Sequence, residues 1–394
     1  MPTIHDPPSY HALVRDYLRT EEKAIWEWYA SNRVQKEHAE SVRFDLLKRT
    51  YRIERESQPA LYDHVDAAVA SLGVRAEVTL YQAQHADGLN ASLAYLPGEA
   101  HIVLQGPVAS KLNASELRGL FGHELGHLIF NEIWDGDLLI ATQVLSAMTN
   151  DRSAETAHYE TARLFSIFRE VYCDRLASQV VGDDTDVIVS MLVKTATGLE
   201  DVDAESYRKQ AMEVLQRASG GSEGTTHPEE YLRARAVDLW REDPGGADQR
   251  VTELIRGTPP LNCLDFIAQQ QLAKQTRALV DAFFTPTWAR TDLLLAHARL
   301  FFDGYEPPQT QNGTLETIQQ YAAKAHDTVR DYLCYVLLDF ASADRDLEEA
   351  PLVHCMGMAE RLGFSERMNE LSGKEFRLRK KQLGQLIDKR EKIL

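Results

Sequence analysis

The chain has few cysteines, and they lie far apart in the sequence. There are four in 394 residues, at Cys173, Cys263, Cys334 and Cys355, and no two form a CxxC pair. This spacing suits a reducing compartment, and it argues against a disulfide framework or a metal site built from cysteines. We therefore expect a cytoplasmic protein.

Long apolar runs are also missing. The sequence has no stretch of about 18 or more apolar residues, the length that a membrane-spanning helix requires. Residues 1–20 lack the apolar core of a signal peptide. We expect no insertion into a membrane.

Basic residues are outnumbered, with 43 Lys and Arg against 60 Asp and Glu, which gives a formal net charge of −17. Such a charge argues against nucleic acid or an anionic membrane surface as a partner. The 44% hydrophobic content is ordinary for a globular protein, and the length exceeds what one core usually serves. Two or three domains are expected.

The residue pattern predicts an α+β fold that is predominantly helical. Residues 9–55 have apolar side chains at roughly helical spacing, which predicts one or two helices. The pattern then alternates like strands at 76–81 and 91–95, and 101–105 forms a third β-rich run, so a small sheet is expected. Helical patterns dominate the rest of the chain.

Two breaks interrupt these helical patterns. Residues 219–224 read as a glycine-rich loop, and a second break with Pro and Gly extends from 243 to 260. Beyond it the pattern is helical almost throughout. We therefore divide the chain into a helical segment at 1–60, an α+β domain at 61–245, a linker at 246–260 and an all-helical domain at 261–394.

The sequence His123-Glu-Leu-Gly-His127 lies within a helix that a capping box, Asn113 to Glu116, is expected to begin. The i, i+4 spacing places both imidazoles on one face, where they can bind a single zinc ion. Zinc lowers the pKa of a bound water, and Glu124 can take its proton and pass it to a leaving amine. The alternative is a chance HExxH whose histidines are merely packed on a partly buried face.

A third ligand is needed from elsewhere in the chain. The metzincin pattern would place Gly and His where the chain has Phe130 and Ile133, so that class is excluded. Glu170 is the better candidate, because it lies on another predicted helix with Asp174 one turn further along the same face. Asp174 can then accept a hydrogen bond from a liganding imidazole. The alternative is an ordinary surface pair of carboxylates.

Three blocks together resemble the HtpX-like and CAAX prenyl protease-type zinc metallopeptidases and their soluble relatives. They are the HELGH helix, the Glu170 and Asp174 spacing, and a Thr-His-Pro block in which Arg233 follows His227 by six residues. The resemblance implies a gluzincin fold with Glu170 as the third zinc ligand. It also implies that His227 and Arg233 lie beside the scissile carbonyl and stabilise the oxyanion. Without the family resemblance, the sequence at His227 and Pro228 would simply indicate the start of a helix.

Two further segments carry resemblances. Asn90–Leu96 is similar to the family's edge strand beside the zinc, which holds an extended substrate by backbone pairing, although a purely structural strand has the same pattern. Residues 335–363 resemble the TerB-like helical domain. This implies an all-α domain, and the two-part architecture of the chain leads to the hypothesis that this domain brings a protein partner or substrate.

We therefore expect a zinc-dependent endopeptidase with one Zn²⁺ ion held by His123, His127 and Glu170, and with Glu124 as the general base. The catalytic set also includes His227 and Arg233, and the substrate is an extended polypeptide. The alternative is a latent or inactive peptidase-fold scaffold or sensor that acts through its C-terminal helical domain.

Overall fold

The structure is a computed structural model, which describes residues 6–31, 36–85, 88–217, 220–309 and 314–391. The chain divides into two compact units, residues 1–257 and 258–394. The predicted fold class, α+β and predominantly helical, is confirmed.

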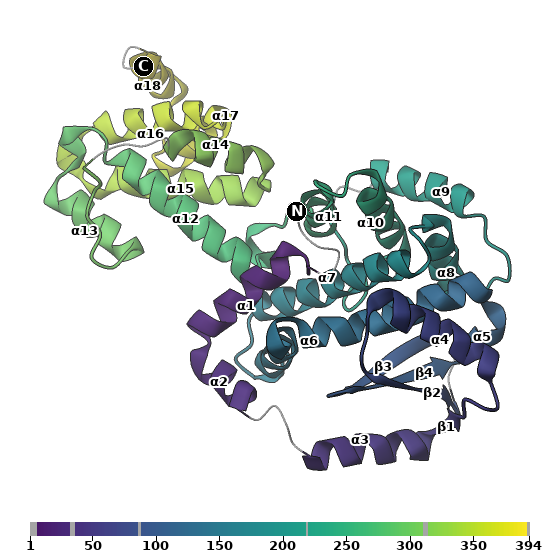
Figure 1. The fold of residues 1–394 in the computed structure, drawn as a ribbon. Helices are drawn as coiled ribbons and strands as arrows, with labels where there is room; N and C mark the ends of the chain where they lie inside the picture. The colour runs from purple at the N-terminus through teal and green to yellow at the C-terminus, as the bar shows by residue number, and fades with distance from the viewer. Residues whose placement is uncertain (1–5, 32–35, 86–87, 218–219, 310–313, 392–394) are drawn as a thin grey trace. The chain divides into compact units, whose positions relative to one another are not determined.

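The first unit contains all the strands that the structure describes and most of the long helices (Figure 1). Its strands are β1 (Thr50–Ile53), β2 (Glu77–Ala83), β3 (Asn90–Leu96) and β4 (Glu99–Gln105). Its helices are α1 (Ser9–Glu21), α2 (Lys23–Ser31), α3 (Lys36–Arg49), α4 (Pro59–Leu72), α5 (Val108–Lys111), α6 (Ala114–Asn150), α7 (Thr156–Val180), α8 (Thr185–Thr197), α9 (Ala204–Arg217), α10 (Glu230–Glu242) and α11 (Ala247–Arg256).

The four strands form one mixed sheet in the order β1-β2-β4-β3. β2 and β4 are parallel, and the two outer pairs are antiparallel. One face is apolar, because Leu80, Ile102 and Leu104 are fully buried there. β3 is an edge strand, and α6 packs directly against β3 and β4. The edge of the sheet therefore lies beside the helix that carries the HExxH sequence.

The three predicted strands are confirmed as β2, β3 and β4. The helical interpretation of residues 9–55 is wrong at its end, where residues 50–53 form β1 and pair with β2. Thr50, Tyr51 and Ile53 are β-branched or aromatic, and pairing with a neighbouring strand outweighs the weak local signal of four residues. The same stretch also holds three helices instead of one or two.

α6 and α7 pack side by side at the centre of the first unit, with α1, α4, α8 and α10 around them (Figure 1). The backbone of α6 leaves the helical conformation at residues 133–136, where Trp134 and Asp135 have positive φ. The predicted helix around His123 and His127 is therefore the regular first half of α6.

The described residues of the second unit form helices only, around a core that includes Phe283, Phe340 and Met356. Residues 246–260 are expected to form a linker, but most of this range is helix α11. This helix belongs to the first unit, where it packs on α10. The second unit contains η1 (Leu261–Cys263), α12 (Phe266–Phe283), η2 (Thr287–Ala289), α13 (Asp292–Phe301), α14 (Thr314–Lys324), α15 (Asp327–Ala343), η3 (Arg345–Leu347), α16 (Ala350–Arg361), α17 (Ser365–Glu375) and α18 (Lys380–Glu391).

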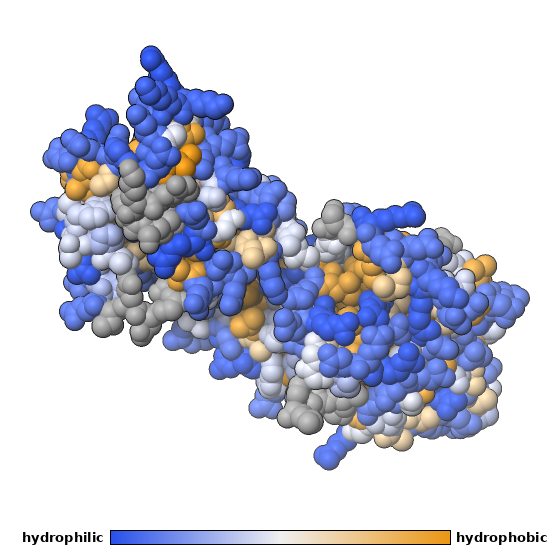
Figure 2. All heavy atoms as spheres, turned by 90° about the horizontal axis from the view of Figure 1, so that it is seen from above, coloured by the Kyte–Doolittle hydropathy of each residue, from blue (hydrophilic) through white to orange (hydrophobic). Residues whose placement is uncertain are grey.

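None of the described helices has the length and apolar character needed to cross a bilayer. The face seen in Figure 2 is mostly hydrophilic, with smaller hydrophobic areas between the charged residues.

Candidate metal centre

The helix that carries the centre is anchored at its first turn. Asn113 Oδ1 accepts hydrogen bonds from the backbone amides of Ser115 and Glu116 at 2.9 and 3.0 Å, and Glu116 reaches back to the Asn113 amide at 2.8 Å. The predicted capping box is therefore confirmed. The buried Glu116 carboxylate also binds Lys194 Nζ at 2.9 Å and the Ser190 hydroxyl at 2.7 Å, both on α8.

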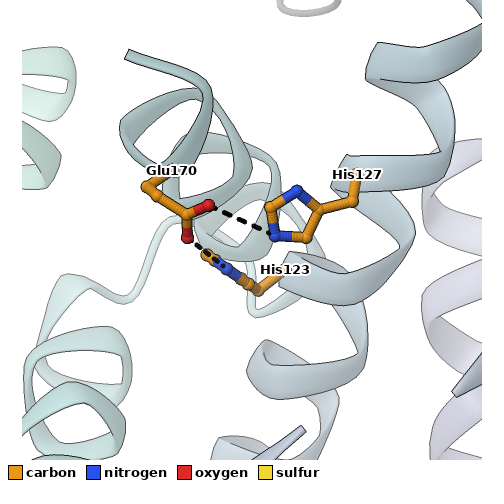
Figure 3. A group of neighbouring side chains, drawn as sticks. All are labelled: His123, His127 and Glu170. Carbon is orange, nitrogen blue, oxygen red and sulfur yellow. Dashed lines mark ion pairs between the residues drawn. The ribbon is translucent and has the colours of Figure 1, made fainter. Parts of the chain in front are cut away.

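Three side chains from α6 and α7 converge on one point (Figure 3). His123 Nε2 lies 3.3 Å from one oxygen of Glu170, and His127 Nε2 lies 3.7 Å from the other. The ligand atoms of all three residues lie within 4.8 Å of one another. The structure thus brings together the three residues that the sequence analysis predicts as metal ligands.

The donor set fits zinc. Two imidazole nitrogens and one carboxylate oxygen leave a fourth tetrahedral position open, which is the composition of a catalytic zinc site. Glu170 Oε2 is buried and makes no hydrogen bond among the described residues. Burial would raise the pKa of Glu170, but the imidazoles of His127 and His123 outweigh it and hold the pKa well below its ordinary value. A buried anion that faces two imidazoles is suited to a divalent cation.

Asp174 orients His123 from behind. His123 Nδ1 donates to Asp174 Oδ1 at 2.9 Å, so Nε2 is the nitrogen that faces Glu170. Burial lowers the pKa of His123, but the nearby carboxylates of Asp174 and Glu170 outweigh it and raise the pKa to about 10 in the metal-free protein. Burial, aided by nearby positive charges, outweighs the carboxylate of Glu170 and lowers the pKa of His127 to about 3. In the metal-free protein a proton therefore lies on His123 Nε2, facing Glu170, and a bound cation would replace this proton.

Arg233 holds the other side of Asp174. Its Nε and Nη2 each donate to one carboxylate oxygen at 2.7 Å, and the residue is 9% exposed. Burial would lower the pKa of Arg233, but the carboxylate of Asp174 raises it. The pair also keeps the pKa of Asp174 low against the effect of burial. Arg233 lines the cavity over the cluster, but two of its donor groups are committed to Asp174.

Glu124 lies between the cluster and the edge strand. Its carboxylate is hydrogen-bonded to the backbone of Leu93 in β3, and its Oε2 is buried without a hydrogen-bond partner among the described residues. Burial raises the pKa of Glu124 to about 7. A carboxylate with this pKa can both accept and return a proton near neutral pH.

His127 has a neighbour that the sequence analysis did not assign. Cys173 Sγ lies 3.4 Å from His127 Nδ1, and burial raises the pKa of this thiol well above its ordinary value. Cys173 therefore remains a thiol that contacts the back of His127, as Asp174 does for His123. The only signal in the sequence is its position three residues after Glu170.

His227 reaches the cluster from a loop. Its Nε2 lies 3.4 Å from Glu170 Oε2, and its side chain is 57% exposed. Arg163 supports the loop by donating to the carbonyls of Ser222 and Gly224 at 2.9 and 3.1 Å. Gly224 is required here, because a Cβ would lie 1.9 Å from the carbonyl oxygen of His227.

A cavity of about 320 Å³ opens over these residues. Its walls include all six residues that the sequence analysis predicts as metal ligands or catalytic groups. Five of them come from α6, α7 and the loop, and the sixth is Arg233. The sequence analysis missed Arg169 and Asn131. The lining consists of Asn90, Ala91, Ser92, Leu93, Leu120, His123, Glu124, His127, Asn131, Arg169, Glu170, Met191, Leu192, Thr195, His227 and Arg233.

In a gluzincin-type metallopeptidase, a helix carries the HExxH motif and a glutamate on a later helix is the third metal ligand. The cluster of His123, His127 and Glu170 has this arrangement. Residues 55–241 match the model for peptidase family M48, which supports this class and a zinc metallopeptidase. Comparison with curated proteins and with solved structures gives no match. The matched range contains β2, β3 and β4 but not β1, and it includes every residue of the candidate site.

Proposed function

We propose that this chain is a zinc-dependent endopeptidase, with one ion held by His123, His127 and Glu170. The observation that carries the proposal is the Glu124 carboxylate, which is buried beside the cluster and has an oxygen that finds no hydrogen-bond partner in the described part of the chain. A structural metal site has no need for such a group, whereas hydrolysis needs a base beside the attacking water. A zinc ion would supply Lewis-acid polarisation of the scissile carbonyl and a water of lowered pKa.

The protein's own side chains divide the remaining tasks. Glu124 takes the proton of the attacking water and passes it to the departing amine. His227, exposed at the cavity and 3.4 Å from Glu170, donates from its imidazole to the oxyanion that develops on the scissile carbonyl. Arg233 acts chiefly through Asp174, whose two oxygens it occupies, and so keeps His123 oriented.

The substrate is an extended polypeptide. β3 is an edge strand along the cavity, and residues 90–93 line it, so a peptide can add to the sheet there by backbone hydrogen bonds. The resemblance to HtpX-like peptidases supports this arrangement. We further propose that the second unit, whose residues 335–363 resemble a TerB-like domain, brings a protein partner or substrate.

The test is cleavage of a mixed peptide library by the zinc-loaded full chain, read by mass spectrometry. Glu124→Gln is the control, since it should retain the metal and lose the base. Defined cuts by the wild type alone, with equal zinc content in both proteins by elemental analysis, support the proposal. If neither protein cuts although both hold zinc, the chain is a latent enzyme or a scaffold.

A further inference from the structure

The cavity changes in chemistry along its length. Leu120, His123, His127 and Asn131 follow one another on one face of α6, about 5 to 6 Å apart per step. At the Leu120 end, α8 adds buried apolar side chains, since Met191 packs against the neighbouring turn of α6 at Gly119. The end beyond His127 has a polar lining instead.

Arg169 lies at this polar end. It precedes Glu170 on α7, and its Nη2 lies 3.8 Å from Glu170 Oε1. That oxygen is the one nearest His127, while Oε2 faces His123 and His227. The guanidinium therefore lines the cavity on the His127 side of the metal centre.

The guanidinium of Arg169 has too few partners for its position. Its Nε is buried without a hydrogen-bond partner among the described residues, and its one ion pair is longer than a hydrogen bond. Arg233, by contrast, makes two bonds of 2.7 Å to its carboxylate. A cation bound by Glu170 would also neutralise the only carboxylate among the described residues that pairs with Arg169. The side chain is 24% exposed, so a ligand in the cavity can reach it.

We propose that Arg169, with Asn131 beside it, forms a carboxylate-binding subsite on the His127 side of the metal centre. Guanidinium groups bind carboxylates through paired hydrogen bonds, which gives both affinity and orientation. The carboxylate comes from an acidic side chain next to the scissile bond or from the C-terminus of a short peptide. This inference rests on the proposed peptidase function and names its substrate class.

The first experiment measures kcat/KM for quenched peptides that differ only in Glu, Gln or Lys next to the cleaved bond. A second pair of peptides has either a free or an amidated C-terminus. The zinc-loaded full chain should favour one type of carboxylate peptide by about 10- to 100-fold, the value of a charged hydrogen-bond pair. The two pairs of peptides show which source of carboxylate the subsite accepts.

Arg169→Gln should remove this preference, because kcat/KM for the Glu peptide should fall to about the value for the Gln peptide. Arg169→Lys keeps the charge, so it should retain part of the preference. This comparison shows whether the effect of the Gln variant comes from the lost charge or from a loss of folding. Arg118→Gln is the matched control, because it removes a partly buried arginine from α6 that does not line the cavity. It should behave as the wild type does.

A binding measurement separates this inference from the proposed function. In a Glu124→Gln background, fluorescence anisotropy with labelled Glu and Gln peptides reports affinity without turnover. Tighter binding of the carboxylate peptide that Arg169→Gln abolishes supports the subsite even if the wild type cleaves nothing. Equal binding of both peptides, or binding of neither, overturns it. Cleavage without a carboxylate preference also overturns it while leaving the peptidase function in place.

Discussion

Asp174 accepts hydrogen bonds from two buried groups, the His123 imidazole at 2.9 Å and the Arg233 guanidinium at 2.7 Å. Asp174→Asn should lower zinc affinity by about 10- to 100-fold, because the His123 tautomer is no longer held. It should also destabilise the fold by about 3 to 5 kcal/mol, since the buried Arg233 loses its counter-charge. Chelator competition and urea unfolding measure the two effects.

Asp238→Asn is the matched control for Asp174. Asp238 is also a buried aspartate, and it pairs with Arg208 Nε at 2.9 Å outside the cavity. Its replacement should reduce stability but leave zinc affinity unchanged. If both variants lose zinc equally, the effect of Asp174 comes from loss of folding and not from orientation of His123.

His11 makes stability depend on pH. It is fully buried, its Nε2 lies 3.0 Å from the carbonyl oxygen of Phe165, and burial lowers its pKa from 6.5 to about 3. Because the unfolded chain binds the proton more readily, stability is full above about pH 6.5 and falls toward pH 3. Each pH unit below about 6.5 lowers the free energy of unfolding by about 1.4 kcal/mol, so at pH 5 the loss is about 2 kcal/mol.

His11→Gln should remove this contribution to the pH dependence. Urea unfolding of the metal-free proteins at pH 7.5 and pH 5 gives the comparison. Between these values the wild type should lose about 2 kcal/mol more than the variant. An equal loss in both proteins would show that His11 is not held neutral in the folded state.

At the scale of elements, the start of α6 depends on the ion pair between Glu116 and Lys194 on α8. Both side chains are buried. Glu116→Gln should destabilise the first unit by about 3 kcal/mol, because the ammonium group of Lys194 stays buried without a charged partner. Unfolding in urea measures this. Addition of Lys194→Met should restore part of the loss, and an additive further loss would contradict a direct pair.

The approach of α6 to α7 depends on Gly126. A Cβ there would lie 3.0 Å from Cys173 Cα and 3.2 Å from its Sγ. Gly126→Ala should therefore separate the helices, with a loss of about 1 to 3 kcal/mol and weaker zinc binding at His127 and Glu170. Gly119→Ala is the control, because its closest neighbour is the flexible end of Ile188 at 3.1 Å. It should change stability by less than about 1 kcal/mol and keep zinc affinity.

At the scale of the whole molecule, each compact unit has its own buried core. A chain ending at Gly257 should therefore fold, bind zinc with the affinity of the full chain and cleave short peptides at the same rate. If the second unit brings protein substrates, their cleavage should fall by about tenfold or more, because linked binding is lost. Equal turnover of protein substrates by both chains would contradict that role.

Much of the metal centre could be predicted from local sequence. The spacing of His123 and His127, the capping box at Asn113 and the helical spacing of Glu170 and Asp174 are properties of single helices. Helix geometry alone places each pair on one face. β1 was missed because its pairing with β2 is not visible in four residues.

The sequence by itself determined the capped helix around the HExxH motif and the types of donor group, because these depend on residues three or four positions apart. Only the tertiary structure decided which nitrogen of His123 faces Glu170, that Arg233 binds Asp174, and that Arg169 enters the cavity with few partners. These contacts join residues from different helices. Their partners depend on how the helices pack in three dimensions, which no local pattern specifies.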